Sequence, residues 1–222
     1  MVRALELFSG TGSVGRVLRA HGHETLSLDI DPRFGPDLCM SILDFDETAY
    51  APDHFDFVWA SCPCEACSIA RSNAKIPRDV VMAASDKLVV KTRQILAHFR
   101  DALWVVENPA TSRIWMREAA KGLAQASVVT SYCAFGYPYR KDTRLANNFG
   151  LSLPRCPGAG ICPAMIGRRH GEHAQCGDTR AGPMARCKTR DELHSIPPAL
   201  ITEILRQVNA TLAAPRAERG AR

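Results

Sequence analysis

The sequence predicts an α/β fold with a doubly wound, mostly parallel sheet. Two observations support this prediction: short apolar runs alternate with stretches of helical periodicity, and three polar motifs follow the ends of apolar runs. Because ligands bind at the carboxyl ends of the strands in such sheets, we expect the three motifs to share one rim. The 222 residues, 46% of them hydrophobic, are enough for one well-buried core with a small appendage.

The individual elements follow from the spacing of the apolar residues. Strands are expected where short apolar runs end at Gly, Pro or polar residues. They cover residues 4–8, 25–30, 39–43, 55–60, 103–106 and 128–132. Helices are expected where apolar residues recur at intervals of three and four. They cover residues 14–22, 81–99, 114–123 and 198–212.

Composition divides the chain into four parts. Residues 1–150 carry the alternating strands and helices and form the main domain. Residues 151–185 are rich in Gly, Pro, Arg, Cys and His without sustained periodicity, so they are expected to form a compact irregular insert. Residues 186–212 return the chain to the main domain, and residues 213–222 are expected to be a disordered tail.

Charge and hydropathy bear on location and partners. No run of 18 apolar residues occurs, so no membrane span is expected, and the N-terminus lacks the features of a signal peptide. We therefore expect an intracellular protein. The net charge of +5 suits a polyanionic partner and equally suits an ordinary soluble surface.

The first polar motif is a glycine-rich turn after the first strand, Phe8-Ser9-Gly10-Thr11-Gly12. Glycines allow a tight turn and let a cofactor approach the backbone. Asp29, at the end of the next strand, is placed to accept hydrogen bonds from ribose hydroxyls. A purely structural turn is the alternative, and Gly15 also completes the G-x-G-x-x-G spacing of dinucleotide binders.

The second motif, at the end of the strand at 55–60, is Ser61-Cys62-Pro63-Cys64-Glu65-Ala66-Cys67-Ser68. Pro63 would hold Cys64 as a fixed, accessible nucleophile, and thiolate is the reactive form of cysteine. Two alternatives stay open: metal binding through the C-x-C-x-x-C spacing, and small thiols packed in a core.

The third motif is Glu107-Asn108-Pro109 after the strand at 103–106. A glutamate at the end of a buried strand is rarely there for packing, so a role in proton transfer is expected. The alternative is a structural carboxylate that caps the next helix.

Nine cysteines are many for an intracellular chain, where thiols serve as core residues, metal ligands or nucleophiles rather than disulfides. Within the insert, the candidate zinc ligands are Cys156, Cys162, His170 and Cys176, with His173 nearby. A zinc ion there would order the insert. Loose surface residues are the alternative, because the spacing is not that of a standard zinc finger.

Taken in order, these motifs resemble the DNA (cytosine-5) methyltransferase family. The matching residues are Phe8, Gly10 and Gly12 (F-x-G-x-G), Asp29, Pro63, Cys64 and Ser68 (P-C-x-x-x-S), and Glu107 and Asn108 (E-N). Residues 186–192 resemble the family's R-x-x-T-x-x-E element, so the likeness spans nearly the whole chain. The insert of 35 residues is shorter than the family's target recognition region, as in compact phage- or virus-type members.

The resemblance implies a Rossmann-like class I methyltransferase fold and S-adenosylmethionine as cofactor. Implied cofactor contacts are Phe8, Ser9, Gly10, Thr11, Gly12, Asp29, Ile30 and Pro63. Implied catalytic residues are Cys64, which adds to C6 of cytosine, Glu107, which hydrogen-bonds or protonates N3, and the basic Lys141 and Arg144. Carbon 5 of a flipped-out base in DNA then takes up the methyl group.

Two other functions remain open at this point. One is cytosine-5 methylation of RNA, because a branch that resembles this family acts on transfer RNA. The other is a catalytically inactive relative that binds nucleic acid. For a DNA substrate, the expected location is the cytoplasm, nucleoid or nucleus, wherever the DNA lies.

Overall fold

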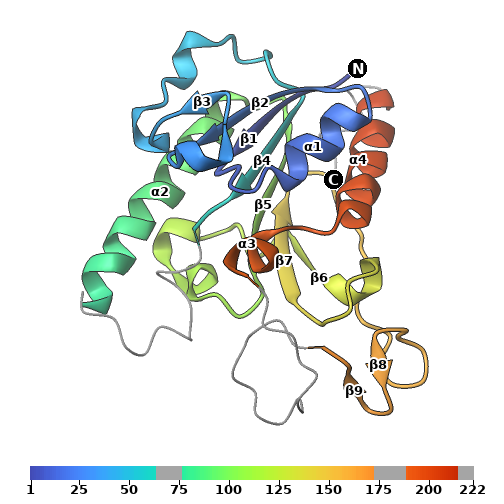
Figure 1. Cartoon of the computed structure of the whole chain (residues 1–222). Helices are drawn as coiled ribbons and strands as arrows, with labels where there is room; N and C mark the ends of the chain where they lie inside the picture. The colour runs from blue at the N-terminus through green and yellow to red at the C-terminus, as the bar shows by residue number, and fades with distance from the viewer. Residues whose placement is uncertain (64–76, 173–188, 215–222) are drawn as a thin grey trace.

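A seven-stranded sheet forms the centre of the protein (Figure 1). The computed structural model describes residues 1–63, 77–172 and 189–214. The strands of the central sheet are β1 (Arg3–Leu7), β2 (Glu24–Asp29), β3 (Leu38–Cys39), β4 (Phe57–Ser61), β5 (Leu103–Pro109), β6 (Ser127–Ser131) and β7 (Asp142–Asn147). Their order across the sheet is β3-β2-β1-β4-β5-β7-β6, and only β7 runs antiparallel to its neighbours among these pairings.

This strand order confirms the predicted fold class. The chain winds outward through β1, β2 and β3, then returns and continues through β4 and β5 on the other side of β1. The antiparallel β7 lies between β5 and β6. This is the arrangement of the Rossmann-like class I methyltransferases. The order in which successive strands are added reverses between β1 and β4, and ligands bind at such a point in doubly wound folds.

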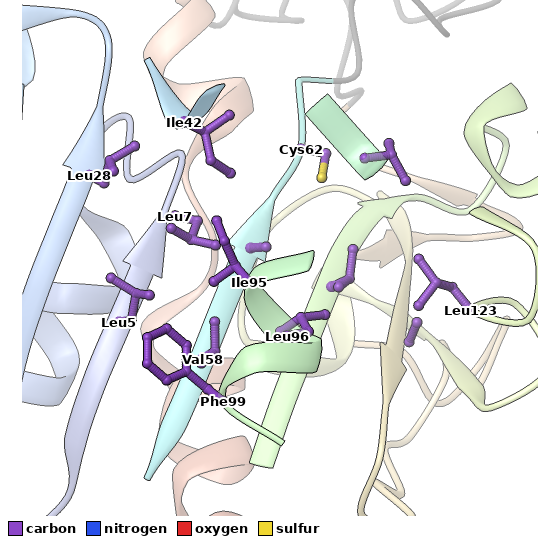
Figure 2. Close-up of a cluster of buried hydrophobic side chains, with 14 of the residues drawn as sticks. Leu5, Leu7, Leu28, Ile42, Val58, Cys62, Ile95, Leu96, Phe99 and Leu123 are labelled. Carbon is purple, nitrogen blue, oxygen red and sulfur yellow. The ribbon is translucent and has the colours of Figure 1, made fainter. Parts of the chain in front are cut away.

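Helices cover both faces of the sheet. Helices α1 (Ser13–Ala20) and α4 (Pro198–Ala213) lie against one face, and α2 (Arg78–His98) lies against the other (Figure 1). Strand residues alternate between the two faces because the side-chain period is two. Leu5 and Leu7 pack in the cluster under α2, which Figure 2 shows in close-up, whereas Ala4 packs in the cluster under α1 and α4.

The insert begins along the edge strand of the sheet. Thr130 donates a hydrogen bond to the carbonyl oxygen of Pro154, and the Cys156 N–H donates to Ser131 Oγ at 3.1 Å. The segment then forms a short hairpin of β8 (Met165–Ile166) and β9 (Arg169–His170). An isolated β-bridge between Tyr139 and Glu172, two residues after β9, connects the segment back to the main domain.

Most predicted elements are present within one to three residues, and a few predictions are wrong. Residues 114–123 form no α-helix but two 3-10 turns, Arg113–Met116 and Glu118–Ala120, separated by an extended Arg117. Arg117 pairs with Asp86 on α2, which fixes this break. The third strand is two residues long, and a 3-10 turn (Ile42–Asp44) takes the rest of the predicted run.

Four further features were not expected from the sequence. Strand β5 continues through the E-N-P motif to Pro109, because β7 pairs with it as far as Thr143. Strand β7 and a short helix, α3 (Arg190–His194), were both missed. Helix α4 includes Ala213, the first residue of the predicted tail, and residues 215–222 lie outside the described residues.

None of the helices in the described part of the chain combines the length and apolar character needed to cross a bilayer.

Candidate active site at the carboxyl ends of the parallel strands

The first and third polar motifs and the described start of the second, Ser61–Pro63, lie at one rim of the sheet, as the sequence predicts. In the parallel register Leu7 is opposite both Leu28 and Ala60, and Ser61 is opposite Glu107. The residues that follow β1, β2 and β4 therefore lie beside the end of β5. They enclose a pocket of about 290 Å³.

The lining of this pocket joins residues from the whole length of the chain. From the predicted site it contains Phe8, Ser9, Gly10, Thr11, Asp29, Pro63, Glu107 and Lys141. Residues that the sequence did not assign to the site also contribute, namely Glu6, Ser13, Val14, Asp31, Arg33, Phe34, Ser61, Cys62, Pro109, Asp191, His194 and Ile196.

The glycine-rich turn has a strained backbone that directs it towards the pocket. Phe8 has φ +58°, the left-handed region that residues with a Cβ rarely adopt, and Gly10 follows at φ +46°. Such strain persists where the surroundings fix the backbone, and it is concentrated at functional sites. Here the Ser9 N–H donates to the carbonyl oxygen of Leu28 at 3.0 Å, and the Gly12 N–H donates to the carbonyl oxygen of Ser9 at 2.8 Å.

Asp29 connects the end of β2 to this turn. One carboxylate oxygen accepts the Gly10 N–H at 2.7 Å, and the other accepts the Asp31 N–H at 2.9 Å. Each carboxylate oxygen has a second lone pair, so Asp29 can still accept hydrogen bonds from a ligand. Asp29 therefore shapes the turn as well as lining the pocket.

Glu6 is a buried acid beneath the pocket that the sequence analysis missed. Burial raises its pKa to about 7, while the hydrogen bond that its Oε2 accepts from the Gly15 N–H, at 3.0 Å, acts in the opposite direction. A Cβ at position 15 would lie 2.5 Å from that Oε2, which explains why a glycine stands there. In the sequence, the signal for this site is a single charged residue within the apolar run at residues 4–8.

The raised pKa of Glu6 predicts a pH-dependent stability. The folded protein binds this proton up to about pH 7, whereas the unfolded chain releases it near 4.5, so the contribution to stability is present at low pH and is lost as pH rises. Glu6→Gln removes this titration. Relative to the wild type, the variant should gain up to about 3 kcal/mol of unfolding free energy between pH 5 and pH 8. Urea denaturation of both proteins across this range measures the gain, and parallel pH profiles would contradict it.

Glu107 is held in place by the neighbouring antiparallel strand. It is buried on β5, and the Thr143 hydroxyl on β7 donates a hydrogen bond to its Oε1. The same hydroxyl lies 3.1 Å from the carbonyl oxygen of Asn108. Thr143 is itself fully buried, so the Glu107 carboxyl has a fixed position at the pocket wall.

Asn108 links β5 to the start of the cysteine motif. Its Nδ2 donates to the carbonyl oxygen of Cys62 at 2.7 Å, and its side chain is buried. This contact fixes the backbone that enters Pro63, which lines the pocket. Cys64 itself, with residues 65–76, lies outside the described residues.

Of the two predicted basic residues, Lys141 lines the pocket and Arg144 does not. Lys141 Nζ donates to the carbonyl oxygen of Leu193 at 2.5 Å and lies 4.8 Å from the centre of the Tyr132 ring. Arg144 stacks over the Trp115 ring at 5.7 Å and donates to Ser127 Oγ at 3.0 Å. The two side chains therefore have different neighbours, although Lys141 immediately precedes β7 and Arg144 lies within it.

Two predicted cofactor residues lie at the margin of the pocket rather than in its lining. Gly12 is the N-cap of α1 at φ +67°, where it completes the turn. Ile30 follows Asp29, and 70% of its surface is exposed, so it presents an apolar face beside the acidic end of β2.

The C-terminal part of the chain closes the pocket. Thr189 and Glu192 form a capping box at the start of α3, in which each side chain accepts a hydrogen bond from the other residue's backbone. The T-x-x-E part of the predicted C-terminal element thus has a structural role. The Ile196 N–H donates to Ser13 Oγ at 3.2 Å, which holds this segment against the start of α1.

The candidate zinc ligands lie apart from the pocket. Cys156, Cys162 and His170 come together at the base of the β8–β9 hairpin, and Cys133 joins them from the 3-10 turn Tyr132–Phe135. Cys176, the fourth ligand considered from the sequence, lies outside the described residues.

The chain is similar to a viral protein in sequence and to several methyltransferases among solved structures. The chain is 32% identical to the probable DNA (cytosine-5)-methyltransferase of Frog virus 3 (isolate Goorha), over 92% of this chain and 99% of the viral protein. No protein-family model matches the sequence.

Among solved structures, the Entamoeba histolytica methyltransferase EhMeth is 15% identical, over 70% of this chain and 56% of its own, with a TM-score of 0.48. The S. pombe Dnmt2 methyltransferase is 16% identical, over 69% and 51%, with a TM-score of 0.46. This chain thus spans about half the length of these two proteins. From its identity with the viral protein over nearly the full length of both, the chain belongs to the DNA (cytosine-5)-methyltransferase family.

Proposed function

We propose that the protein transfers the methyl group of S-adenosylmethionine to carbon 5 of cytosine in DNA, with Cys64 as nucleophile. The observation that supports this most directly is the register of β4 and β5. It places Glu107 opposite Ser61, three residues before Cys64, at the pocket that the glycine-rich turn also lines. The name of the Frog virus 3 relative supports DNA as the substrate and carbon 5 of cytosine as the position of methylation.

The described residues fit S-adenosylmethionine. The turn at Phe8–Gly12 brings backbone to the pocket without intervening side chains at Gly10, and Asp29 offers carboxylate lone pairs suited to ribose hydroxyls. Ile30 and Phe8 offer apolar surface for an adenine ring. The bound cofactor would supply an electrophilic methyl group.

The remaining chemistry belongs to the protein's own residues and the base. Carbon 5 of cytosine is a weak nucleophile. Addition of the Cys64 thiolate to C6, with Glu107 donating a proton or hydrogen bond to N3, makes C5 electron-rich enough to take up the methyl group. Loss of the C5 proton and departure of Cys64 then regenerate the thiolate. Because C5 is inaccessible in a duplex, the base must leave the stack, and Lys141 provides a positive charge at the pocket that receives it.

The test is nucleoside mass analysis of DNA and RNA from a host without its own cytosine-5 methylation. Expression of the wild type should produce 5-methylcytosine in DNA, and Cys64→Ala should abolish it, since loss of a covalent nucleophile lowers rates by about 10⁴-fold or more. Cys67→Ala, in the same motif, is the matched control and should retain the product.

Two outcomes would contradict the proposal. Product confined to RNA would reassign the substrate, and absence of product with folded protein would favour a nucleic-acid-binding role without catalysis. The covalent step has its own test, a randomised duplex pool in which 5-fluorocytosine replaces cytosine. Fluorine cannot leave C5 as a proton does, so a denaturation-resistant adduct should form with the wild type and not with Cys64→Ala.

A further inference from the structure

Three cysteines and one histidine from separate segments meet at the outer edge of the sheet. Cys133 follows β6, Cys156 follows β7, Cys162 precedes β8 and His170 ends β9. Their candidate ligand atoms all lie within 4.8 Å of one another. We propose that Cys133, Cys156, Cys162 and His170 bind one structural zinc ion.

The distances agree with tetrahedral coordination. His170 Nε2 lies 3.5 Å from Cys156 Sγ and 3.6 Å from Cys162 Sγ. Zinc–sulfur bonds of about 2.3 Å and zinc–nitrogen bonds of about 2.0 Å at the tetrahedral angle place sulfur and nitrogen about 3.5 Å apart. A single S–H···N hydrogen bond would account for one of these approaches, whereas one central ion accounts for both and for the third sulfur.

The local chain is built for such a site. In Cys156-Pro157-Gly158-Ala159-Gly160-Ile161-Cys162, the Cys162 N–H donates to the carbonyl oxygen of Gly158 at 2.9 Å, which curls the loop so that both sulfurs face one side. Three thiolates, a neutral histidine and Zn²⁺ leave one net negative charge, and Arg140 lies near enough to interact with it.

The segment also has almost no apolar core of its own. Between residues 154 and 172, all of which the structure describes, Cys162 alone is buried, while Ile161 and Ile166 are 73% and 79% exposed. A segment of this size without an apolar core needs a covalent or metal cross-link to hold its shape. Zinc would fasten the β8–β9 hairpin to the turn after β6, and so to the rigid sheet.

This ligand set differs from the one that the sequence suggests, because Cys133 replaces Cys176. The two sets make opposite predictions. Protein purified under reducing conditions without chelator should contain one zinc ion per chain by inductively coupled plasma mass spectrometry. Cys133→Ser and Cys162→Ser should each lose most of this zinc, whereas Cys176→Ser and the exposed-site control Cys39→Ser should retain it.

X-ray absorption of the wild-type protein provides a test that does not depend on whether the variants fold. The expected zinc environment is three sulfurs at about 2.3 Å and one nitrogen at about 2.0 Å. Absence of stoichiometric zinc in folded, reduced protein would overturn the proposal, as would a disulfide among these cysteines. Full zinc content in folded Cys133→Ser together with its loss in Cys176→Ser would overturn it as well. None of these measurements depends on methyl transfer.

Discussion

Glu107→Gln should lower kcat by about 10²- to 10⁴-fold, the range over which a positioned proton donor accelerates reactions. Glutamine keeps the shape of the side chain and its acceptor for the Thr143 hydroxyl, but it cannot transfer a proton to N3 of the base. Single-turnover methylation of a mixed DNA substrate measures the loss. The affinity for S-adenosylmethionine, measured by calorimetry, should change little, because Glu107 lies on the side of the pocket assigned to the base.

A variant at Thr143 separates positioning from catalysis. Thr143→Val removes the hydroxyl that holds the Glu107 carboxyl and should reduce kcat by about tenfold, the equivalent of one buried hydrogen bond. Thr143→Ser keeps the hydroxyl and should restore most of the rate. Wild-type kcat in Glu107→Gln would show that this carboxyl donates no proton, and equal rates in the valine and serine variants would show that Thr143 acts through packing.

Phe99→Ala should destabilise the protein by about 3 to 5 kcal/mol, the usual cost of removing a buried aromatic ring. The ring is fully buried where α2 ends (Figure 2). It meets the Phe55 ring edge to face, with centroids 5.1 Å apart. For a protein of this size, the melting temperature should fall by roughly 10 °C or more.

The matched control for this variant is Val90→Ala on α2, the helix that Phe99 follows. Val90 is 44% exposed, so its truncation should change the unfolding free energy by no more than about 0.5 kcal/mol. Chemical denaturation of both variants gives the comparison. A loss below about 1 kcal/mol in Phe99→Ala would mean that the core under α2 closes around the missing ring, against the expectation for rigid packing.

The elements that local patterns specify could be predicted from the sequence, and those that depend on distant partners could not. Strand β2 and helix α4 lie within about a residue of their predicted bounds, because their apolar spacing is self-contained. Strand β7 was missed because its inward side chains include Thr143, which is polar and is satisfied by Glu107 on another strand.

The same division applies to the sites. The pocket could be expected because parallel strands bring their carboxyl ends to one rim, and motifs at three strand ends then meet. Cys133 could not be assigned as a zinc ligand, because 22 residues of chain separate it from Cys156 and nothing local relates the two. Arg144 was predicted as a site residue from the resemblance of its basic cluster to the family. Successive side chains of a strand point to opposite faces, so Arg144 points away from the face on which Thr143 contacts Glu107.

The packing of α4 against α1 has a consequence for synthesis of the protein. Leu200, Ile204 and Val208 complete the cluster that covers Ala4 and Leu18, and these partners are about 190 residues apart in the chain. During translation the first strand and helix are therefore made long before the helix that shields them. In a nascent chain that stalls before residue 198, the part of the apolar face that α4 covers would stay exposed, and such surface promotes aggregation.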